Sequence, residues 1–160
     1  MTALVSVPRN MASNGEGVTV WFQREFSLPA KRRGCHYISE EILKACKDEL
    51  SKIKIGTAHI HIKHTSASLI LNENYDPTVL TDMEMVLNRI APQDWKYQHS
   101  LEGPDDMPAH AKAALMGSSV TVPITNGQFN LGTWQGVWLC EHRDSGGSRK
   151  LVVTMNGLKK

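Results

Sequence analysis

The sequence predicts an α+β protein built on an antiparallel β-sandwich core with two main helices. Several short runs are rich in β-branched and aromatic residues, and two stretches place apolar residues at helical spacing. The elements follow the order strand, helix, strands, helix, loop, strands. This order, with helices set apart from runs of strands, is typical of α+β proteins dominated by antiparallel sheet.

The first expected elements are a strand and an amphipathic helix. Residues 18–26, VTVWFQREF, predict a strand that Pro29 ends or marks as an edge. In residues 39–50, SEEILKACKDEL, acids occupy the first turn and apolar residues recur at helical spacing. Ser39 is placed to cap the N-terminus of this predicted helix.

In the middle of the chain, side chains alternate between two strand faces, and a second helical pattern follows. Residues 57–73, TAHIHIKHTSASLILNE, predict strand, with Ala58, Ile60, Ile62 and His64 on one face and His59, His61 and Lys63 on the other. Residues 79–90 have apolar positions at helical spacing, and Pro92 follows them. We predict a second helix there.

The last part is expected to contain a long loop followed by strands. Residues 93–108 hold Pro, Gly and Asp with little apolar periodicity, and a loop of this length is often functional. A short helix is expected over residues 109–115. Beyond Gly117, three or four strands follow, with a turn at Asn126-Gly127.

Composition bounds the class of protein. A chain of 160 residues, 41% of them hydrophobic, fits one domain over residues 18–160 behind a flexible N-terminal tail, residues 1–17. The net charge of +2 is too small to indicate nucleic acid as a partner. The three cysteines match no disulfide or metal-binding spacing, and no stretch is long enough for a membrane span. We expect a cytoplasmic protein with free, buried thiols and no membrane partner.

The segment His64-Thr65-Ser66 follows the alternating strand and can carry chemistry. An imidazole beside two hydroxyls can transfer protons or bind a phosphate or hydroxyl group. A strand-end histidine beside a turn stabilised by hydroxyl groups explains the same residues equally well. Taken alone, the segment leaves both interpretations open.

A second candidate is the loop that contains His99, Asp106 and His110. Residues 99–110 hold two imidazoles and three carboxylates, which can act together as acid and base or can hold a divalent cation that binds a phosphate. The spacing matches no standard zinc pattern, so a metal site would have to be completed in space. A charged surface loop is the alternative.

Two further segments hold polar residues near expected strand ends. Gly132 and Gly136 flank Thr133-Trp134-Gln135, where a backbone can approach a ligand or another chain closely. Taken alone, the segment is better explained by a β-bulge with a buried tryptophan. Asn74 follows an apolar run, where a polar strand terminus is the plain interpretation.

Taken in order, residues 64–84 (HTSASLILNENYDPTVLTDME), 99–119 (HSLEGPDDMPAHAKAALMGSS) and 131–143 (LGTWQGVWLCEHR) resemble the YjbQ-like family, also called UPF0047. The resemblance covers roughly residues 18–157. It implies a YjbQ-like fold and a homotrimer. It also implies a secondary thiamine-phosphate synthase activity, in which a hydroxymethylpyrimidine diphosphate joins a thiazole phosphate with loss of diphosphate. The primary role of the family is not established.

The resemblance also assigns expected roles to residues. His64, Asp106 and His110 are the catalytic candidates, and a substrate is expected to contact Thr65, Ser66, Asn74, Thr133 and Gln135. His99, Asp106 and His110 are the candidate ligands of a divalent metal, Mg or Zn. The joint order of the motifs favours one shared cleft. A small phosphorylated metabolite is the expected partner.

Three kinds of function remain open at this point. The first is a low-efficiency transferase that acts on phosphorylated thiamine precursors. The second is a binding module for a small phosphorylated metabolite, without turnover. The third is a metal-dependent hydrolase that uses the histidine and aspartate loop.

Overall fold

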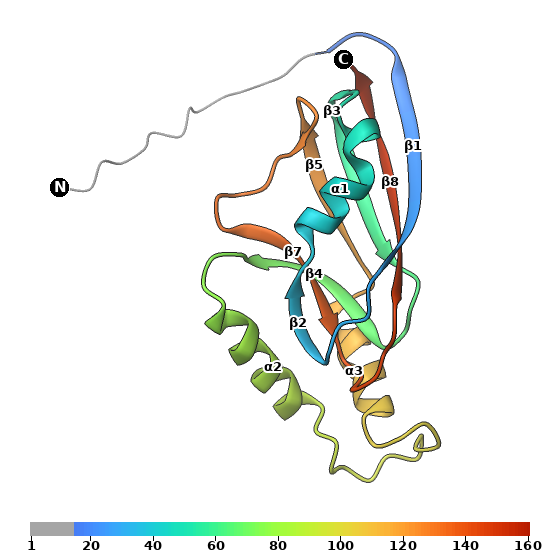
Figure 1. Ribbon diagram of the computed structural model, residues 1–160, viewed down its shortest axis with the longest axis vertical. Helices are drawn as coiled ribbons and strands as arrows, with labels where there is room; N and C mark the ends of the chain where they lie inside the picture. Colours follow the sequence, from blue (N-terminus) through green and yellow to red (C-terminus); the bar gives the residue numbers. More distant parts are fainter. Residues whose placement is uncertain (1–14) are drawn as a thin grey trace, which may run out of the picture.

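The computed structural model describes residues 15–160, which form two antiparallel sheets and three helices (Figure 1). The α+β class and the sandwich core are therefore confirmed. Residues 1–14, most of the expected N-terminal tail, lie outside the described residues, so the tail remains a prediction.

Eight strands and three helices lie within the described residues. The strands are β1 (Thr19–Leu28), β2 (Gly34–Tyr37), β3 (Ile53–Ile62), β4 (Ala67–Glu73), β5 (Ser119–Thr125), β6 (Gln128–Phe129), β7 (Gln135–Glu141) and β8 (Arg149–Lys159). The helices are α1 (Ser39–Leu50), α2 (Thr78–Ile90) and α3 (Asp106–Met116).

Each sheet is antiparallel throughout. The larger has the strand order β1-β8-β3-β5-β6 and the smaller the order β2-β7-β4. The hairpin between β5 and β6 turns at Asn126 and Gly127, which both have positive φ, at 52° and 81°. This matches the two-residue hairpin turn expected from the sequence, because two successive positive φ values suit Asn-Gly.

The main core lies between the two sheets. Alternate residues of β3 and β8 point inward, as the period of two requires, and meet Val137 and Leu139 of β7 and the buried face of α1. The opposite face of β7 carries Trp138 and Cys140, which pack against α2. The smaller sheet is therefore covered on one face by the larger sheet and on the other by α2.

Four details differ from what the sequence predicts. Strand β2 was not expected, because its four residues are too few to show a period. Ser39 does not cap α1: Ile38 occupies the cap position, and the Ser39 hydroxyl accepts a hydrogen bond from the Val137 N–H at 2.9 Å. The third helix is longer than expected and begins at Asp106. Trp134 is not buried in a bulge but is 55% exposed in the turn before β7.

The state of the three cysteines agrees with expectation. Cys35, Cys46 and Cys140 are all buried and free. Within residues 15–160, none of the helices combines the length and the apolar character that crossing a bilayer needs.

A pH dependence of stability follows from His142, which lies directly after β7 and is 1% exposed. Burial, followed by the charges of Lys112, Arg33 and Arg149, lowers the pKa of His142 to about 3. In the unfolded chain His142 takes up a proton near its ordinary pKa of about 6.5. The stability that the protein gains from a neutral His142 is therefore fully present above about pH 6.5 and is lost as the pH falls toward 3.

We expect the free energy of unfolding to fall by up to about 1.4 kcal/mol per pH unit below pH 6.5. Urea unfolding between about pH 7 and about pH 5, where most carboxylates stay ionised, measures this slope. It should be shallower in His142→Gln than in the wild type or in His61→Gln, which alters a partly exposed histidine. Parallel slopes in all three proteins would contradict the assignment.

Candidate metal centre

Helix α3 brings Asp106 and His110 to one face. The two residues are four apart, and side chains at that spacing lie one turn above the other. The helix starts at Asp106 even though Pro108 follows, because the first turn of a helix needs no backbone N–H from proline. The expected loop is thus shortened by three residues at its end, and the carboxylate becomes part of a rigid element.

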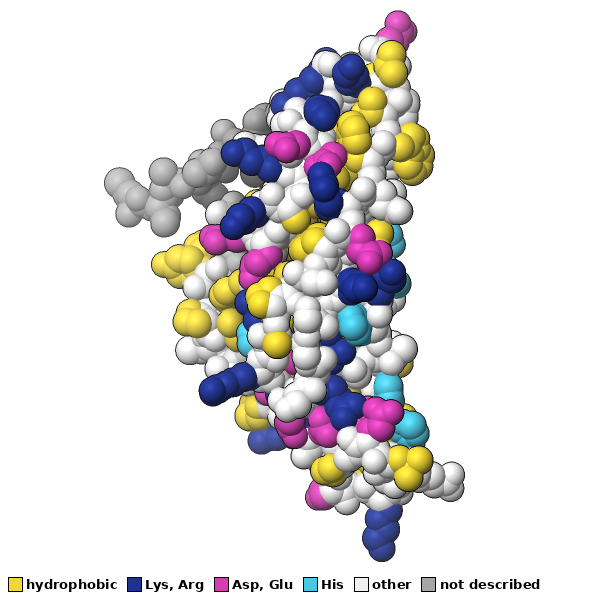
Figure 2. Space-filling view, turned by 45° about the vertical axis from the view of Figure 1, so that its right-hand side comes forward, with side chains coloured by type: hydrophobic (Ala, Val, Ile, Leu, Met, Phe, Trp, Pro, Cys, Tyr) yellow, Lys and Arg dark blue, Asp and Glu magenta, His cyan; other side chains and the backbone are white. Residues whose placement is uncertain are grey.

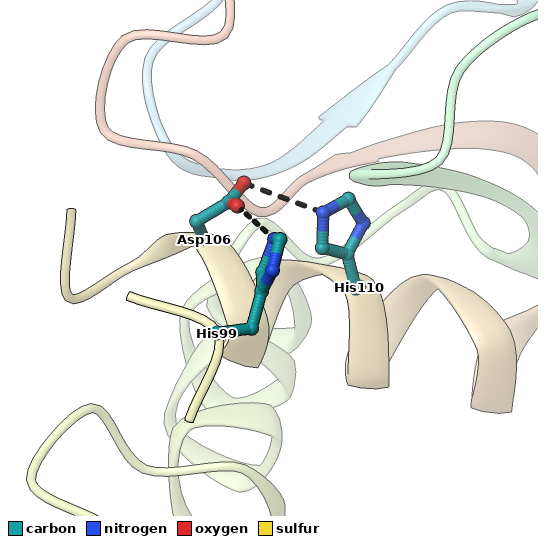
Figure 3. A group of neighbouring side chains, drawn as sticks. All are labelled: His99, Asp106 and His110. Atoms are coloured by element: carbon teal, nitrogen blue, oxygen red, sulfur yellow. Dashed lines mark ion pairs between the residues drawn. The ribbon is translucent and has the colours of Figure 1, made fainter. Parts of the chain in front are cut away.

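His99 completes the group from the loop before α3. Its Nε2 lies 2.8 Å from Asp106 Oδ2, and His110 Nε2 lies 3.4 Å from Asp106 Oδ1. Figure 3 shows both imidazole rings directed at the carboxylate. One ligand atom from each residue can be chosen so that all three lie within 4.8 Å of one another. Two imidazoles and one carboxylate are a common ligand set for transition metals.

The hydrogen bond of His110 fixes which ring nitrogen faces the group. Its Nδ1 lies 3.0 Å from the Thr65 carbonyl oxygen, which can only accept, so Nδ1 carries the hydrogen. In the neutral ring the Nε2 lone pair then points toward the Asp106 carboxylate. A cation bound between them would satisfy both groups, and a carbonyl bond to the outer nitrogen is the usual support of a metal-bound histidine.

Asp106 itself has an oxygen without a hydrogen bond. The side chain is 1% exposed, and Oδ2 has no hydrogen-bond partner among the described residues. His99 Nε2 is near enough at 2.8 Å, but the hydrogen on that ring nitrogen would not point at the oxygen, so the contact is a close approach only. A buried carboxylate oxygen left unpaired is costly, and a bound cation would remove that cost.

Arg143 holds the acidic residues in place. Its guanidinium donates to Asp105 Oδ2 at 2.8 Å, to Asp106 Oδ1, and to the Glu102 carbonyl oxygen at 2.9 Å. Burial acts to raise the pKa of Asp105, but the Asp144 N–H and Arg143 outweigh it and hold the pKa below its ordinary value. The carboxylates of Glu102, Asp105 and Asp106 all lie near this one guanidinium. Their excess of negative charge favours a bound cation.

A buried ion pair supports the loop that carries Arg143. Arg149 donates to both oxygens of Glu141 at 2.6 Å, and their side chains are 5% and 0% exposed. Arg149 also donates to the Ser66 hydroxyl at 3.2 Å, so Ser66 is held inside the fold. Gly146 lies against the pair, where a Cβ would approach Glu141 Oε1 to 2.4 Å. A side chain at position 146 would therefore displace the pair.

A cavity of about 340 Å³ is lined in part by His64, Thr65 and His110, so it reaches the cluster of candidate ligands at His110. His64 Nε2 accepts a hydrogen bond from the Lys150 N–H at 2.8 Å, and its Nδ1 lies 3.4 Å from Arg149. Burial, followed by the charge of Arg149, lowers the pKa of His64 although Glu141 opposes the change. His64 is thus a neutral wall of the cavity.

The other expected substrate-binding residues lie elsewhere. Asn74 donates to the Gln135 carbonyl, the Gln135 side chain accepts from the Gly132 N–H, and Thr133 is exposed in the same turn. This group lies at the far end of β4 from His64. Strand β4 spans six residue steps, or about 20 Å at 3.3 Å per residue. One chain therefore does not bring the motifs into a shared cleft.

Sequence reasoning missed Arg143, Glu141 and Arg149. A signal was available: two arginines flank the glycine-containing loop of residues 144–148, and a glutamate directly follows the apolar run of residues 137–140. Without the fold, these charges are equally consistent with a solvated loop.

The fold and the three ligand candidates define a two-sheet α+β protein with a candidate metal centre at the start of α3. The chain belongs to the UPF0047 YjbQ-like family, whose sequence model matches residues 24–158. It is 46% identical to the UPF0047 protein YjbQ of Escherichia coli O157:H7 over 138 residues, covering 86% of this chain and 99% of the relative. It is 36% identical over 105 residues to YugU of Bacillus subtilis, covering 66% and 77%.

Solved structures show the same fold. A YjbQ/UPF0047-family protein from Clostridium acetobutylicum, an uncharacterized conserved protein, has a TM-score of 0.72 at 36% identity, covering 82% of this chain and 98% of that one. A YbjQ-like protein of unknown function from Sulfolobus solfataricus P2 has a TM-score of 0.78 at 20% identity, covering 88% and 99%. At that lower identity the likeness shows the fold alone.

Removing one charge of the buried pair should destabilise the whole protein. In Glu141→Gln the Arg149 guanidinium loses its buried counter-charge, so we expect the free energy of unfolding to fall by about 3–5 kcal/mol. Urea denaturation of Glu141→Gln, Arg149→Met and the double variant gives the coupling between the two residues. The double variant should lose less than the sum of the single losses. Additive losses would show that the pair is not coupled.

Proposed function

We propose that this protein is a metal-dependent transferase that acts on small phosphorylated molecules. The observation that carries the proposal is the cluster of His99, Asp106 and His110, in which Asp106 has a buried, unpaired carboxylate oxygen. His110 also lines a cavity of about 340 Å³. A divalent cation held there would meet a ligand at the mouth of that cavity. Charge neutralisation at phosphate oxygens is the chemistry such a site supplies.

We propose zinc rather than magnesium as the metal. Zinc accepts imidazole and carboxylate ligands at about 2.0–2.2 Å, and a tetrahedral set of such ligands spaces its atoms by about 3.3 Å. The 3.4 Å between His110 Nε2 and Asp106 Oδ1 is close to that spacing, whereas the 2.8 Å between His99 Nε2 and Asp106 Oδ2 is shorter, so His99 would move outward on binding the ion. Magnesium prefers oxygen ligands and keeps several waters, which two imidazoles do not suit.

Thiamine-phosphate synthase chemistry is the specific reaction we propose, as a secondary activity in the cytoplasm. The thiazole nitrogen forms a bond to the methylene carbon of the pyrimidine, the C–O bond to the diphosphate breaks, and its electron pair leaves with the diphosphate. The family resemblance and the candidate metal centre support this. Such a reaction depends on orientation and on stabilising the leaving group more than on a strong base.

In this proposal the residues have distinct roles. Asp106, His99 and His110 hold the cation, while Arg143 positions the carboxylate. Thr65 contributes its exposed hydroxyl at the cavity and its carbonyl to His110. His64 shapes the cavity wall, since both ring nitrogens already face donors. Three protein ligands also leave a position open for water, which favours a metal-dependent hydrolase as the second candidate.

Metal binding is the first test. Wild-type protein supplied with zinc should retain about one ion per chain by mass spectrometry of the metal content. Loss of groups that merely support a ligand weakens metal affinity by about 10–100-fold, so Asp106→Asn and His110→Ala should lose more than that. His61→Ala, which removes a histidine outside the cluster, is the matched control. A wild type that retains no metal, or variants that retain as much as the control, would contradict the centre.

The reaction is the second test. Zinc-loaded protein is incubated with hydroxymethylpyrimidine diphosphate and thiazole phosphate, separately and together, and thiamine phosphate, diphosphate and phosphate are measured. A transferase forms thiamine phosphate only with both substrates, and His110→Ala abolishes it. Phosphate release from one substrate alone indicates the hydrolase, and saturable binding without any product indicates a binding module. Light scattering on the same samples should show the homotrimer that we propose, in wild type and variant alike.

A further inference from the structure

A second cavity adjoins the first. It has a volume of about 350 Å³ and is lined by Ser27, Lys63, His64, Ser148 and Lys150. His64 lines both cavities. Figure 2 shows histidine side chains along the right-hand side of the molecule, with basic and acidic side chains beside them.

Two lysines are held side by side in this second cavity. The Lys63 N–H donates to the Lys150 carbonyl at 2.9 Å, which fixes the two residues next to each other. Both ammonium groups turn to one acid: Lys63 Nζ lies 2.9 Å and Lys150 Nζ 3.9 Å from the Glu25 carboxylate. The hydrogen bond from Lys63 lowers the pKa of Glu25, so the acid is ionised at neutral pH. One positive charge remains uncompensated.

The groups around the lysines suit an anion. Ser27 brings a hydroxyl donor to the same cavity, whereas the one hydrogen of the Ser148 hydroxyl is donated to the Leu28 carbonyl at 2.6 Å. His64 adds no third charge, since its Nε2 accepts the Lys150 N–H and Arg149 lies at its other nitrogen. Ammonium groups with hydroxyl donors are a common setting for phosphate oxygens.

The loop between β7 and β8 links the candidate metal centre to the second cavity. Its Arg143 binds Asp105 and Asp106, and its last residue, Ser148, lines the second cavity together with Lys150 of β8. The buried pair of Glu141 and Arg149 fixes both ends of that loop. The metal side is negative and the lysine side is positive, and His64 lines the cavity on each side.

We propose that Lys63 and Lys150 form a phosphate-binding subsite that holds one end of a ligand whose other end reaches the candidate metal centre. The part of this inference that concerns a two-ended ligand rests on the proposed function. Binding of phosphate at the two lysines does not require the metal. The preferred ligand class is a small molecule with two separated anionic groups, such as a phosphate ester that also carries a diphosphate or a carboxylate.

Inorganic phosphate is the probe for the subsite. Isothermal titration at low ionic strength, with sodium chloride of equal ionic strength as the blank, measures its binding. The titration uses Asp106→Asn, which lacks the metal ligand, so that phosphate cannot be held through a cation. We expect millimolar binding that weakens about tenfold when Lys63→Gln or Lys150→Gln is added, because each substitution removes a charged donor. Lys54→Gln, an exposed lysine elsewhere on β3, is the control.

A gain of affinity separates the subsite from a structural role of the lysines. Glu25→Gln frees Lys63 and removes a repulsive charge, so phosphate should bind about fivefold more tightly, whereas Asp48→Asn on α1 should have no effect. Absent phosphate binding, or binding unchanged by both lysine substitutions, would overturn the proposal. The metal content of the wild type is measured separately, so failure of the metal centre and failure of the subsite give different results.

Discussion

The ion pair between Glu141 and Arg149 joins the end of β7 to the start of β8 in the interior of the protein. Burying two charges is favourable only when the geometry is good and the remaining donors are satisfied. Here both carboxylate oxygens accept from the guanidinium, and Ser66 accepts another of its hydrogens. The pair therefore fixes the loop between the strands and the connection from β3 to β4 at the same time.

Both proposed binding regions depend on elements that this pair holds. Arg143, two residues beyond Glu141, reaches the acids at the start of α3, and Lys150, one residue beyond Arg149, lines the second cavity. Helix α3 is held from its other side by Lys112, which is 0% exposed and donates to Asn88 at 2.7 Å. The overall charge is only +2, yet the start of α3 is a negative region and the second cavity is a positive one.

Periodicity made much of the fold predictable. The alternation along residues 58–62 assigned the buried face of β3, and helical spacing located α1 and α2, because burial in a sandwich follows local patterns. The turn at Asn126-Gly127 was predictable because both residue types tolerate the positive φ values that a two-residue hairpin turn requires. The start of α3 did not follow, since residues 93–108 hold Pro, Gly and Asp with little apolar periodicity. Strand β2 is defined only by its pairing with β7.

The sequence by itself determined the fold class, the family and the identity of the metal-ligand candidates, because these depend on local pattern and residue chemistry. Only the tertiary structure decided which candidates meet. It joined His99 to Asp106 and His110, placed Asn74 and Gln135 at the other end of β4, and brought in Arg143. Spatial proximity between distant segments is set by strand pairing and burial, and a single sequence does not record those long-range contacts.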